Sequence, residues 1–345
     1  MGASIGLAAR EAGWETRIAD VDSEKTSEAS AVTGLLGLSQ GFDPDVVVVG
    51  TPPSSAALTI SKALQLYPKS IVIDIASIKN ELISDVYTVV GQNAQYVPTH
   101  PMAGRAVSGA LNARFDLFLD RRWVICPQPA NTPEVLEKVE QLVRDCGALP
   151  IYMAADVHDR SVSSTSHLPQ IVSSLLAKQL ERLTDDQIAV SGPGLRDMTR
   201  LAESNSSLWT DIVLSNNRHI YDSLLAFIDE ATTLASAIKD SESETIDRLL
   251  KAGNVQRERI PGKHGEVAQP YVTLSVMLDD KPGQLAGIFD CAGKAEINIE
   301  DVRIDHALGR NTAIVELSIK PQSVKALESA LVDAGWNVRD SDIAR

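Results

Sequence analysis

Short runs rich in Val and Ile alternate with amphipathic segments over residues 1–150, and this alternation restricts the possible folds more than any other feature of the sequence. Strands that are buried on both faces of a parallel sheet have this near-continuous apolar character. The intervening segments have helical periodicity, so the repeating unit is strand–helix–strand. The pattern predicts an α/β domain with a Rossmann-like doubly wound sheet. The predicted strands are residues 16–19, 45–50, 70–75, 94–97 and 123–126, with a helix at 54–66.

Residues 151–252 carry no strand signal. Leu168, Val172 and Leu175 recur at helical spacing, and a longer helical pattern runs from Trp209 to Ile228. We therefore expect an all-α domain that contributes to the substrate site. Its apolar faces are larger than one small bundle buries, which favours pairing of two subunits into a homodimer.

The last part of the chain has a different pattern. Residues 253–270 contain two Pro, three Gly and scattered charges, as a linker does. Residues 271–345 then predict strands at 271–278, 298–304, 313–319 and 337–338, with helices at 283–294 and 323–334. This βαββαβ order is that of a ferredoxin-like domain.

Composition excludes several classes of function. The formal net charge of −14 argues against nucleic acid and anionic membranes as partners, because both require clustered Lys and Arg. The three cysteines form no CxxC pair and no metal-ligand spacing, so we expect no metal site and a reducing compartment. No run approaches the roughly 18 apolar residues of a membrane span, and we expect a cytoplasmic protein.

The first candidate cofactor site is the glycine-rich start of the chain. Gly2 fits the last glycine of a dinucleotide-binding turn, and Ser4 and Ile5 follow it at the start of a helix. Asp20 fits the acid that binds the ribose hydroxyls and favours NAD over NADP, with Asp22 as a substitute. The preceding strand and the first two glycines are absent, so we expect that the reading frame begins upstream; a plain helix start is the alternative.

Three further segments place polar groups just after buried strands, where the ligand crevice of such a sheet lies. Thr51 and Pro52 lie at the end of one strand. They either contact a cofactor or are an ordinary strand end without a binding role. Ser77 follows the next strand and is a candidate for hydrogen bonding to substrate or nicotinamide, while Lys79 is read as a solvated helix cap. His100 is held extended by the proline after it and suits a general base, with a structural histidine as the alternative.

The helical domain offers groups that bind anions. The Ser-His-Leu-Pro-Gln segment is predicted to open a helix, where backbone N–H groups favour negative charge. Arg196 and Arg200 are predicted to lie one turn apart on one helix face, as a fork for a carboxylate. A surface salt bridge is the plainer explanation of either arginine. The segment supplies Ser166, His167 and Gln170 as candidate substrate-binding residues.

Taken together these segments resemble the prephenate dehydrogenase family of tyrosine biosynthesis, in the right order and over almost the whole chain. The resemblance implies NAD-dependent oxidative decarboxylation of prephenate to 4-hydroxyphenylpyruvate. By the family pattern His100 removes the hydroxyl proton, Ser77 orients the hydroxyl and His100, and Arg200 binds the ring carboxylate. The matching segments are the glycine-rich start and residues 74–79, 99–105, 166–170 and 196–209.

The C-terminal segment resembles an ACT domain, which implies regulation by tyrosine or another aromatic amino acid. The residues that carry this resemblance are 280–285, after the first predicted strand of the domain, and 297–299, after its first predicted helix. The Gly283 turn lets the amino and carboxylate groups of an effector approach the backbone. The candidate effector residues are Gly283, Leu285, Asn298 and Ile299.

Several alternatives stay open. Many family members have histidine at the position of Gln170, so arogenate is an alternative substrate to prephenate. Some relatives have an acidic gating residue at a position near Arg105. This chain has a different residue there, so the gating role cannot be carried over. A catalytically impaired amino-acid sensor is a rival of another class, and a β-hydroxyacid dehydrogenase is a rival enzyme, although no equivalent of its helix-borne catalytic lysine is found.

Overall fold

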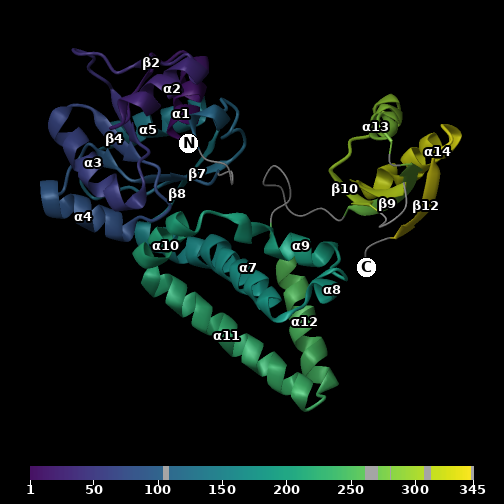
Figure 1. Cartoon of the computed structure of the whole chain (residues 1–345). Helices are drawn as coiled ribbons and strands as arrows, with labels where there is room; N and C mark the ends of the chain where they lie inside the picture. The colour runs from purple at the N-terminus through teal and green to yellow at the C-terminus, as the bar shows by residue number, and fades with distance from the viewer. Residues whose placement is uncertain (104–108, 261–270, 280, 307–311, 343–345) are drawn as a thin grey trace. The chain divides into compact units, whose positions relative to one another are not determined.

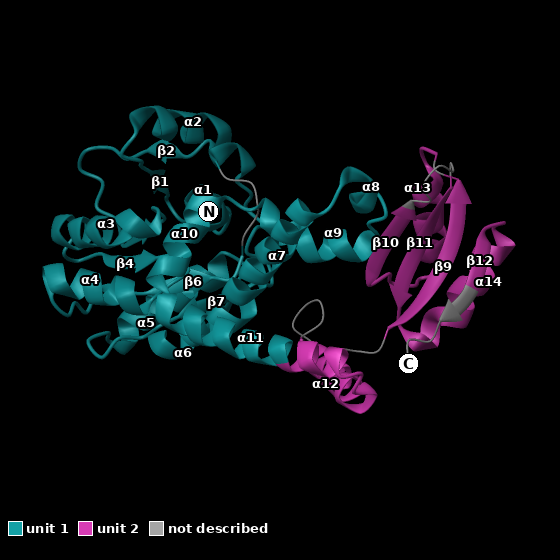
Figure 2. Ribbon diagram, turned by 60° about the horizontal axis from the view of Figure 1, so that its bottom comes forward, with its two compact units in different colours: residues 1–232 teal, residues 233–345 magenta. Residues whose placement is uncertain are grey.

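The computed structural model describes residues 1–103, 109–260, 271–279, 281–306 and 312–342. The chain divides into two compact units, Met1–Thr232 and Thr233–Arg345 (Figure 2). The first unit holds the α/β domain and most of the helical domain, and the second holds the C-terminal sheet (Figure 1). Among the described residues, none of the helices combines the length and the apolar character that a bilayer span requires.

The described strands of the first unit form three sheets. β1 (Arg17–Ile18) pairs in parallel with β2 (Leu36–Gly37). β3 (Val46–Val49), β4 (Ile71–Asp74) and β5 (Tyr96–Val97) form a parallel sheet in that order. β6 (Thr99–Pro101) runs antiparallel to β7 (Arg122–Ile125), which is parallel to β8 (Leu149–Tyr152).

Helices cover both faces of the β3–β4–β5 sheet, as successive residues of β4 show. Ile71 and Ile73 belong to the apolar cluster of α1 (Gly2–Glu11) and α5 (Pro133–Asp145). Val72 belongs instead to the cluster of α3 (Pro53–Leu66) and α4 (Asn80–Val90). Because strand side chains alternate between faces, this division confirms the Rossmann-like doubly wound arrangement. A further helix, α2 (Ser23–Thr33), is capped by the Asp22 side chain.

The helical part begins with a continuous run of helix from residue 155 to residue 178. It consists of α6 (Ala155–Val162), a π-helical stretch (Ser163–His167) and α7 (Leu168–Lys178). Shorter helices follow and lead to the long α11, which crosses from the first unit into the second. The later helices are α8 (Asp185–Ile188), α9 (Pro193–Thr199), α10 (Ser206–Ser215), α11 (Asn217–Lys239) and α12 (Ser243–Arg257), with 3₁₀ turns at Gln179–Arg182 and Arg200–Glu203.

The C-terminal part contains the predicted βαββαβ order of elements. An antiparallel sheet in the order β10-β11-β9-β12 packs its buried face, which includes Leu274 and Val315, against Ile288 and Leu327 of the helices. The elements are β9 (Val272–Asp279), α13 (Gln284–Lys294), β10 (Asp301–His306), β11 (Thr312–Ile319), α14 (Val324–Asp333) and β12 (Asn337–Asp342). The strand predicted at 298–304 was placed too early, because β10 begins only at Asp301.

Candidate active site

His100 lies in β6 and contacts a second histidine from the helical part. Its Nδ1 is 2.9 Å from Nε2 of His158, and the two rings meet edge to face with centroids 5.1 Å apart. Burial lowers the pKa of His100 well below 6.5, and the charges of His158, Lys79 and His167 lower it further. His100 is therefore a neutral imidazole at pH 7, as a proton acceptor must be.

His158 and Asp159 form the second half of this cluster and were missed by the sequence analysis. Both are buried at the centre of α6, and His158 Nδ1 is 2.8 Å from Asp159 Oδ1. The same carboxylate accepts hydrogen bonds from the backbone N–H groups of Lys79 at 2.9 Å and Asn80 at 2.8 Å. Asp159 thus caps α4 from the helical part. The available signal was a His-Asp pair a few residues after the strand that ends at Tyr152.

Lys79 is not the solvated helix cap that the sequence analysis considered. Its side chain is completely buried, and Nζ donates to the Asp74 carboxylate and, at 2.6 Å, to the Thr99 carbonyl oxygen. Tyr96 also donates to Asp74, at 3.0 Å. A buried lysine needs such partners because an isolated charge in the interior is costly. The pair binds the end of β4 to the strand that carries His100.

Ser77 lies between β4 and α4, partly buried and two residues before Lys79. Its place in the structure is given only by its nearness in sequence to Lys79, whose side chain contacts the Thr99 carbonyl, so the predicted orienting role of Ser77 stays a prediction. Gly104 and Arg105, the end of the histidine motif, lie outside the described residues.

The segment from Ser166 to Gln170 does not open a helix, so the prediction of free N–H groups there is wrong. The segment passes from the π-helical stretch into α7 without a break. Pro169 has no N–H to donate to the preceding turn, and a π-helical stretch is one way in which a helix accommodates such a residue. Ser166 is partly buried on this stretch.

His167 belongs to the same buried cluster as Asp159. Asn216 donates to the Asp159 carbonyl oxygen at 2.9 Å and lies 3.2 Å from His167 Nδ1. The ring of His167 meets that of Trp209 edge to face at 5.9 Å. Burial lowers the pKa of His167 to about 4, so this histidine is neutral and binds as a hydrogen-bonding group, not as a cation.

Gln170 connects α7 to the segment that carries Arg200. Its amide Nε2 donates to the Leu201 carbonyl oxygen at 2.7 Å, and its Oε1 accepts from Ser204 at 3.3 Å. Both ends of the amide are therefore engaged within the protein. The side chain positions the Arg200 turn, and a direct contact with substrate would require these bonds to be exchanged.

Arg196 and Arg200 lie in two consecutive helical elements, so the predicted fork on one helix face stays a prediction. α9 ends at Thr199, and Arg200 begins a 3₁₀ turn that narrows the helix. Both guanidinium groups are exposed, and within the described part of the chain neither makes an ion pair. An unengaged guanidinium on a turn held by Gln170 suits a carboxylate ligand.

The start of α1 and the end of β3 approach closely, as expected of a dinucleotide-binding turn. A Cβ atom on Gly50 would lie 3.6 Å from the α-carbon of Gly2. The Thr51 hydroxyl beside them is buried and has no hydrogen-bond partner among the described residues. A buried polar group without a partner is costly, and a cofactor hydroxyl or phosphate at this position would satisfy it.

Two of the predicted cofactor residues, Ser4 and Ile5, have side chains that point into the protein interior. Ser4 is buried, and its hydroxyl accepts from the backbone N–H of Arg114 at 3.1 Å. Ile5 is part of the apolar core, and its own N–H donates to the Met1 carbonyl oxygen. The helical period turns these side chains toward the sheet, so neither side chain is available to a cofactor.

The two acids that follow β1 differ in how far their carboxylates are engaged within the protein, and the choice of Asp20 stays a prediction. Asp22 uses its carboxylate to cap α2 by accepting from the Glu24 N–H at 2.9 Å. Asp20 lies exposed just beyond β1, and among the described residues its carboxylate accepts a hydrogen bond only from the Asp22 backbone N–H. Pro52 is exposed at the start of α3, beside Thr51.

The residues proposed for an effector differ in exposure. Gly283 has a left-handed backbone, with φ of 89°, and precedes α13 on the surface. Leu285 and Ile299 pack against the core of the sheet, and Asn298 is exposed and donates to Glu300. Asn298 and Ile299 precede β10 instead of forming part of it.

A doubly wound nucleotide-binding domain, with a partly buried neutral histidine at a strand end and an adjoining helical domain, defines the class of two-domain nucleotide-dependent dehydrogenases. Comparison with known protein families shows which family within this class the chain matches. The family described as "Prephenate dehydrogenase, nucleotide-binding domain" matches residues 5–152, and "Prephenate dehydrogenase, dimerization domain" matches residues 154–252. The chain belongs to the prephenate dehydrogenase family.

Individual relatives agree with this assignment. The chain is 27% identical to the probable prephenate dehydrogenase NovF of Streptomyces niveus, over 97% of this chain and 96% of that protein. It is 24% identical to the prephenate dehydrogenase of Bacillus subtilis, over 97% and 93%. The crystal structure of prephenate dehydrogenase from Aquifex aeolicus in complex with hydroxyphenyl propionate and NAD+ is 26% identical, with a TM-score of 0.69 over 75% of this chain and 94% of that one.

Proposed function

We propose that the protein is an NAD-dependent prephenate dehydrogenase that converts prephenate to 4-hydroxyphenylpyruvate and carbon dioxide. Family membership and the NAD-bound relative support this function. The observation that carries it is the neutral, partly buried His100 at the end of a strand beside the nucleotide-binding domain. His100 Nε2 takes the proton of the ring hydroxyl, and Ser77 orients that hydroxyl.

The residues at the strand ends fit the cofactor. The unpaired Thr51 hydroxyl and the close approach of Gly2 to Gly50 leave a place for the dinucleotide at the start of α1. The exposed Asp20 carboxylate accepts from ribose hydroxyls and repels the extra phosphate of NADP. NAD supplies the hydride acceptor when it is bound.

A paired assay tests this function. The full chain is given prephenate or arogenate, each with NAD or NADP, and reduced cofactor and aromatic product are both measured. We expect the highest kcat/KM with prephenate and NAD. A preference for arogenate would make the protein an arogenate dehydrogenase, and absence of turnover with either substrate would favour an amino-acid sensor.

Arg200 binds the ring carboxylate in this proposal. Arg200→Ala is expected to raise KM for prephenate, with a loss of about 2 to 4 kcal/mol of binding free energy, because a charge-assisted pair is removed. The kcat should change much less, and NAD affinity should stay the same. Arg182→Ala, at another exposed arginine of the helical part, is the control. Arg196→Ala shows whether a second guanidinium takes part, and an unchanged KM in Arg200→Ala would contradict the role.

We propose a division into a nucleotide-binding domain (1–150), a helical substrate and dimerisation domain (151–252), a linker (253–270) and a regulatory domain (271–345). The exposed apolar side chains of α11 favour a homodimer through the helical domain. They include Tyr221, Leu225, Phe227 and Ile228.

We further propose that the C-terminal part is an ACT domain that binds tyrosine or another aromatic amino acid. The βαββαβ order and the strand order β10-β11-β9-β12 support a ferredoxin-like fold. The exposed left-handed turn at Gly283 leaves backbone groups open to an amino acid. Calorimetry with tyrosine, phenylalanine and tryptophan identifies the effector.

A further inference from the structure

Three side chains form an unbroken line of contacts that starts at His100. His100 Nδ1 is 2.9 Å from His158 Nε2, and His158 Nδ1 is 2.8 Å from Asp159 Oδ1. His158 and Asp159 are 1% and 2% exposed, so water does not compete for these groups. His158 and Asp159 therefore take their hydrogen-bond partners from the protein.

The chemistry of a carboxylate sets the direction of each hydrogen bond along this line. The Asp159 carboxylate receives two backbone N–H donors as well as the histidine, which suits the ionised, acceptor-only form. His158 Nδ1 must then carry the proton that it donates to Asp159. In a neutral imidazole the other nitrogen is an acceptor, so His158 Nε2 accepts from His100 Nδ1–H.

The same reasoning determines whether Nε2 of His100, the nitrogen that would take up the proton, carries a hydrogen. If His100 carries its proton on Nδ1, its Nε2 holds the lone pair. A base needs that lone pair, and the opposite tautomer would present an N–H to the substrate hydroxyl instead. The fixed acceptor at Asp159 thus determines the tautomer of a histidine two groups away.

We propose that His158 and Asp159 are positioning residues that hold His100 in the Nδ1–H tautomer and aim its Nε2 at the substrate hydroxyl. The proposal rests on the proposed function, because it assumes that His100 is the base. His158 and Asp159 touch neither substrate nor cofactor in this arrangement. They act through His100, as the outer partners of a catalytic or metal-bound histidine do.

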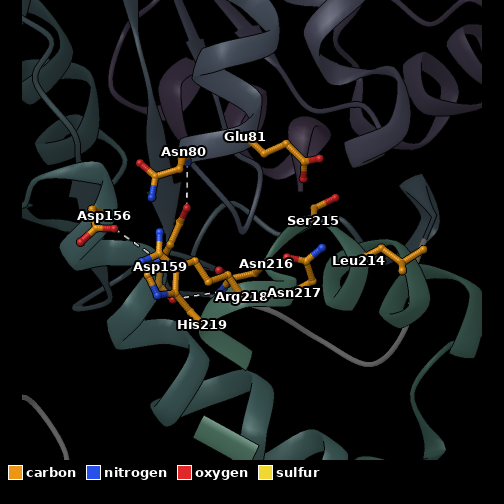
Figure 3. A pocket seen from close by; sticks show the side chains of 10 residues that line it. All are labelled: Asn80, Glu81, Asp156, Asp159, Leu214, Ser215, Asn216, Asn217, Arg218 and His219. Atoms are coloured by element: carbon orange, nitrogen blue, oxygen red, sulfur yellow. Dashed lines mark hydrogen bonds and ion pairs between the residues drawn. The ribbon is translucent and has the colours of Figure 1, made fainter. Parts of the chain in front are cut away.

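Asp159 is rigidly held, as the role requires. Figure 3 shows its side chain directed at the start of α4, where the Asn80 backbone donates to it. The Asn216 side chain, at the end of α10, donates to the Asp159 backbone carbonyl. These residues line a polar pocket of about 350 Å³, from which the Asp159 carboxylate is itself almost entirely shielded.

The line also affects how His100 titrates. The groups around His100 are His158 and Asp159 of α6, Lys79 with its partner Asp74, and His167 of the π-helical stretch. Burial lowers the pKa of His100, and the charges of His158, Lys79 and His167 lower it further. A side chain at position 158 that cannot take up a proton at acid pH does not repel the His100 imidazolium, while burial remains, so the acid limb of kcat/KM should move to higher pH.

Three variants of the full-length enzyme separate the role from simple packing. His158→Phe leaves His100 Nδ1–H without an acceptor, and we expect kcat to fall about 10- to 100-fold. His158→Gln offers an amide that can both accept and donate, and should recover kcat to within about 5-fold of the wild type. Asp159→Asn places an N–H₂ group where an acceptor stood and favours the wrong tautomer, so kcat should fall by about 10³-fold or more.

KM for prephenate and Kd for NAD should stay within about 3-fold in the two His158 variants, because the binding residues are untouched. The urea midpoint of each variant, followed by tryptophan fluorescence, checks that it is folded. His219→Gln is the matched control, since His219 contacts Asp156 and not His100. Its kcat and its pH profile should match those of the wild type.

The outcomes distinguish this proposal from the proposed function. If His100→Asn loses activity while His158→Phe keeps the wild-type kcat and acid limb, the positioning role is overturned and the function stands. Equal losses in His158→Phe and His158→Gln would also overturn it, because the acceptor would then not matter. If His100→Asn itself keeps kcat, the base assignment fails first.

Discussion

Replacement of His100 by asparagine is expected to lower kcat by about 100-fold or more and to leave KM for prephenate and the affinity for NAD nearly unchanged. Asparagine fills a similar volume and keeps hydrogen-bonding groups, but it has no nitrogen that takes up a proton. Initial rates at saturating prephenate and NAD, together with NAD titration by fluorescence, measure the two effects separately.

The pH profile provides a second measure of the same variant. Burial lowers the pKa of His100 in the wild type, so the active neutral form persists below pH 6.5 and activity is lost only as the pH falls through that lowered value. The residual activity of His100→Asn should lack this acid limb. His219→Asn is the control, at a histidine that contacts Asp156. A variant with intact kcat and a raised KM would show that His100 binds the substrate and is not the base.

The fold of the α/β domain could be predicted because its signal is local. Every residue of β4 is buried, and the run rich in Ile and Val at 70–75 is what a strand between two helical layers must have. The βαββαβ order of the C-terminal part follows for the same reason, since β9 alternates buried and partly buried residues along its length. The ends of strands could be predicted less well. Ile299 lies between polar residues just before β10, an alternation that a strand would also have, although β10 begins only at Asp301.

The polar centre of the site could not be predicted, because its partners are distant in sequence. His100 and His158 are 58 positions apart, and Asp159 caps α4 from 80 positions beyond Lys79. Nothing local distinguishes a buried Lys79 from an exposed one, since only the fold brings Asp74 and the Thr99 carbonyl to its ammonium group. The histidine motif at a strand end predicted one member of this cluster, His100, and its partners in the helical part became visible only in the structure.

The glycine-rich start of the chain also shows what cannot be predicted from a local motif. The structure places Gly2 near the end of β3, but a Cβ atom on Gly2 would meet nothing within 4 Å, so its role as the last glycine of a dinucleotide-binding turn stays a prediction. The motif did not reveal that Ser4 and Ile5 turn inward, since the phase of the helix depends on what packs beneath it. The orphaned Thr51 hydroxyl is visible only once its neighbours are placed.

The largest effect on stability is expected from Lys79→Met, which should lower the free energy of unfolding of the first unit by about 3 to 5 kcal/mol. Methionine retains most of the volume of lysine but removes the charge. The Asp74 carboxylate, 1% exposed, would then be a buried charge without its cation, and the Thr99 carbonyl would lose a donor. Urea unfolding followed by tryptophan fluorescence reports on this unit, because Trp14, Trp123 and Trp209 lie within it.

Two further variants show whether the loss comes from the unpaired charge. Lys178→Met removes an exposed lysine that pairs with Glu181, and it should hardly change the unfolding midpoint because surface pairs contribute little. Asp74→Asn combined with Lys79→Met removes both charges and should recover much of the stability, since replacing a whole buried pair costs less than breaking it. A double variant no more stable than Lys79→Met alone would mean that the lysine stabilises the strand ends by packing and hydrogen bonding, and not by neutralising Asp74.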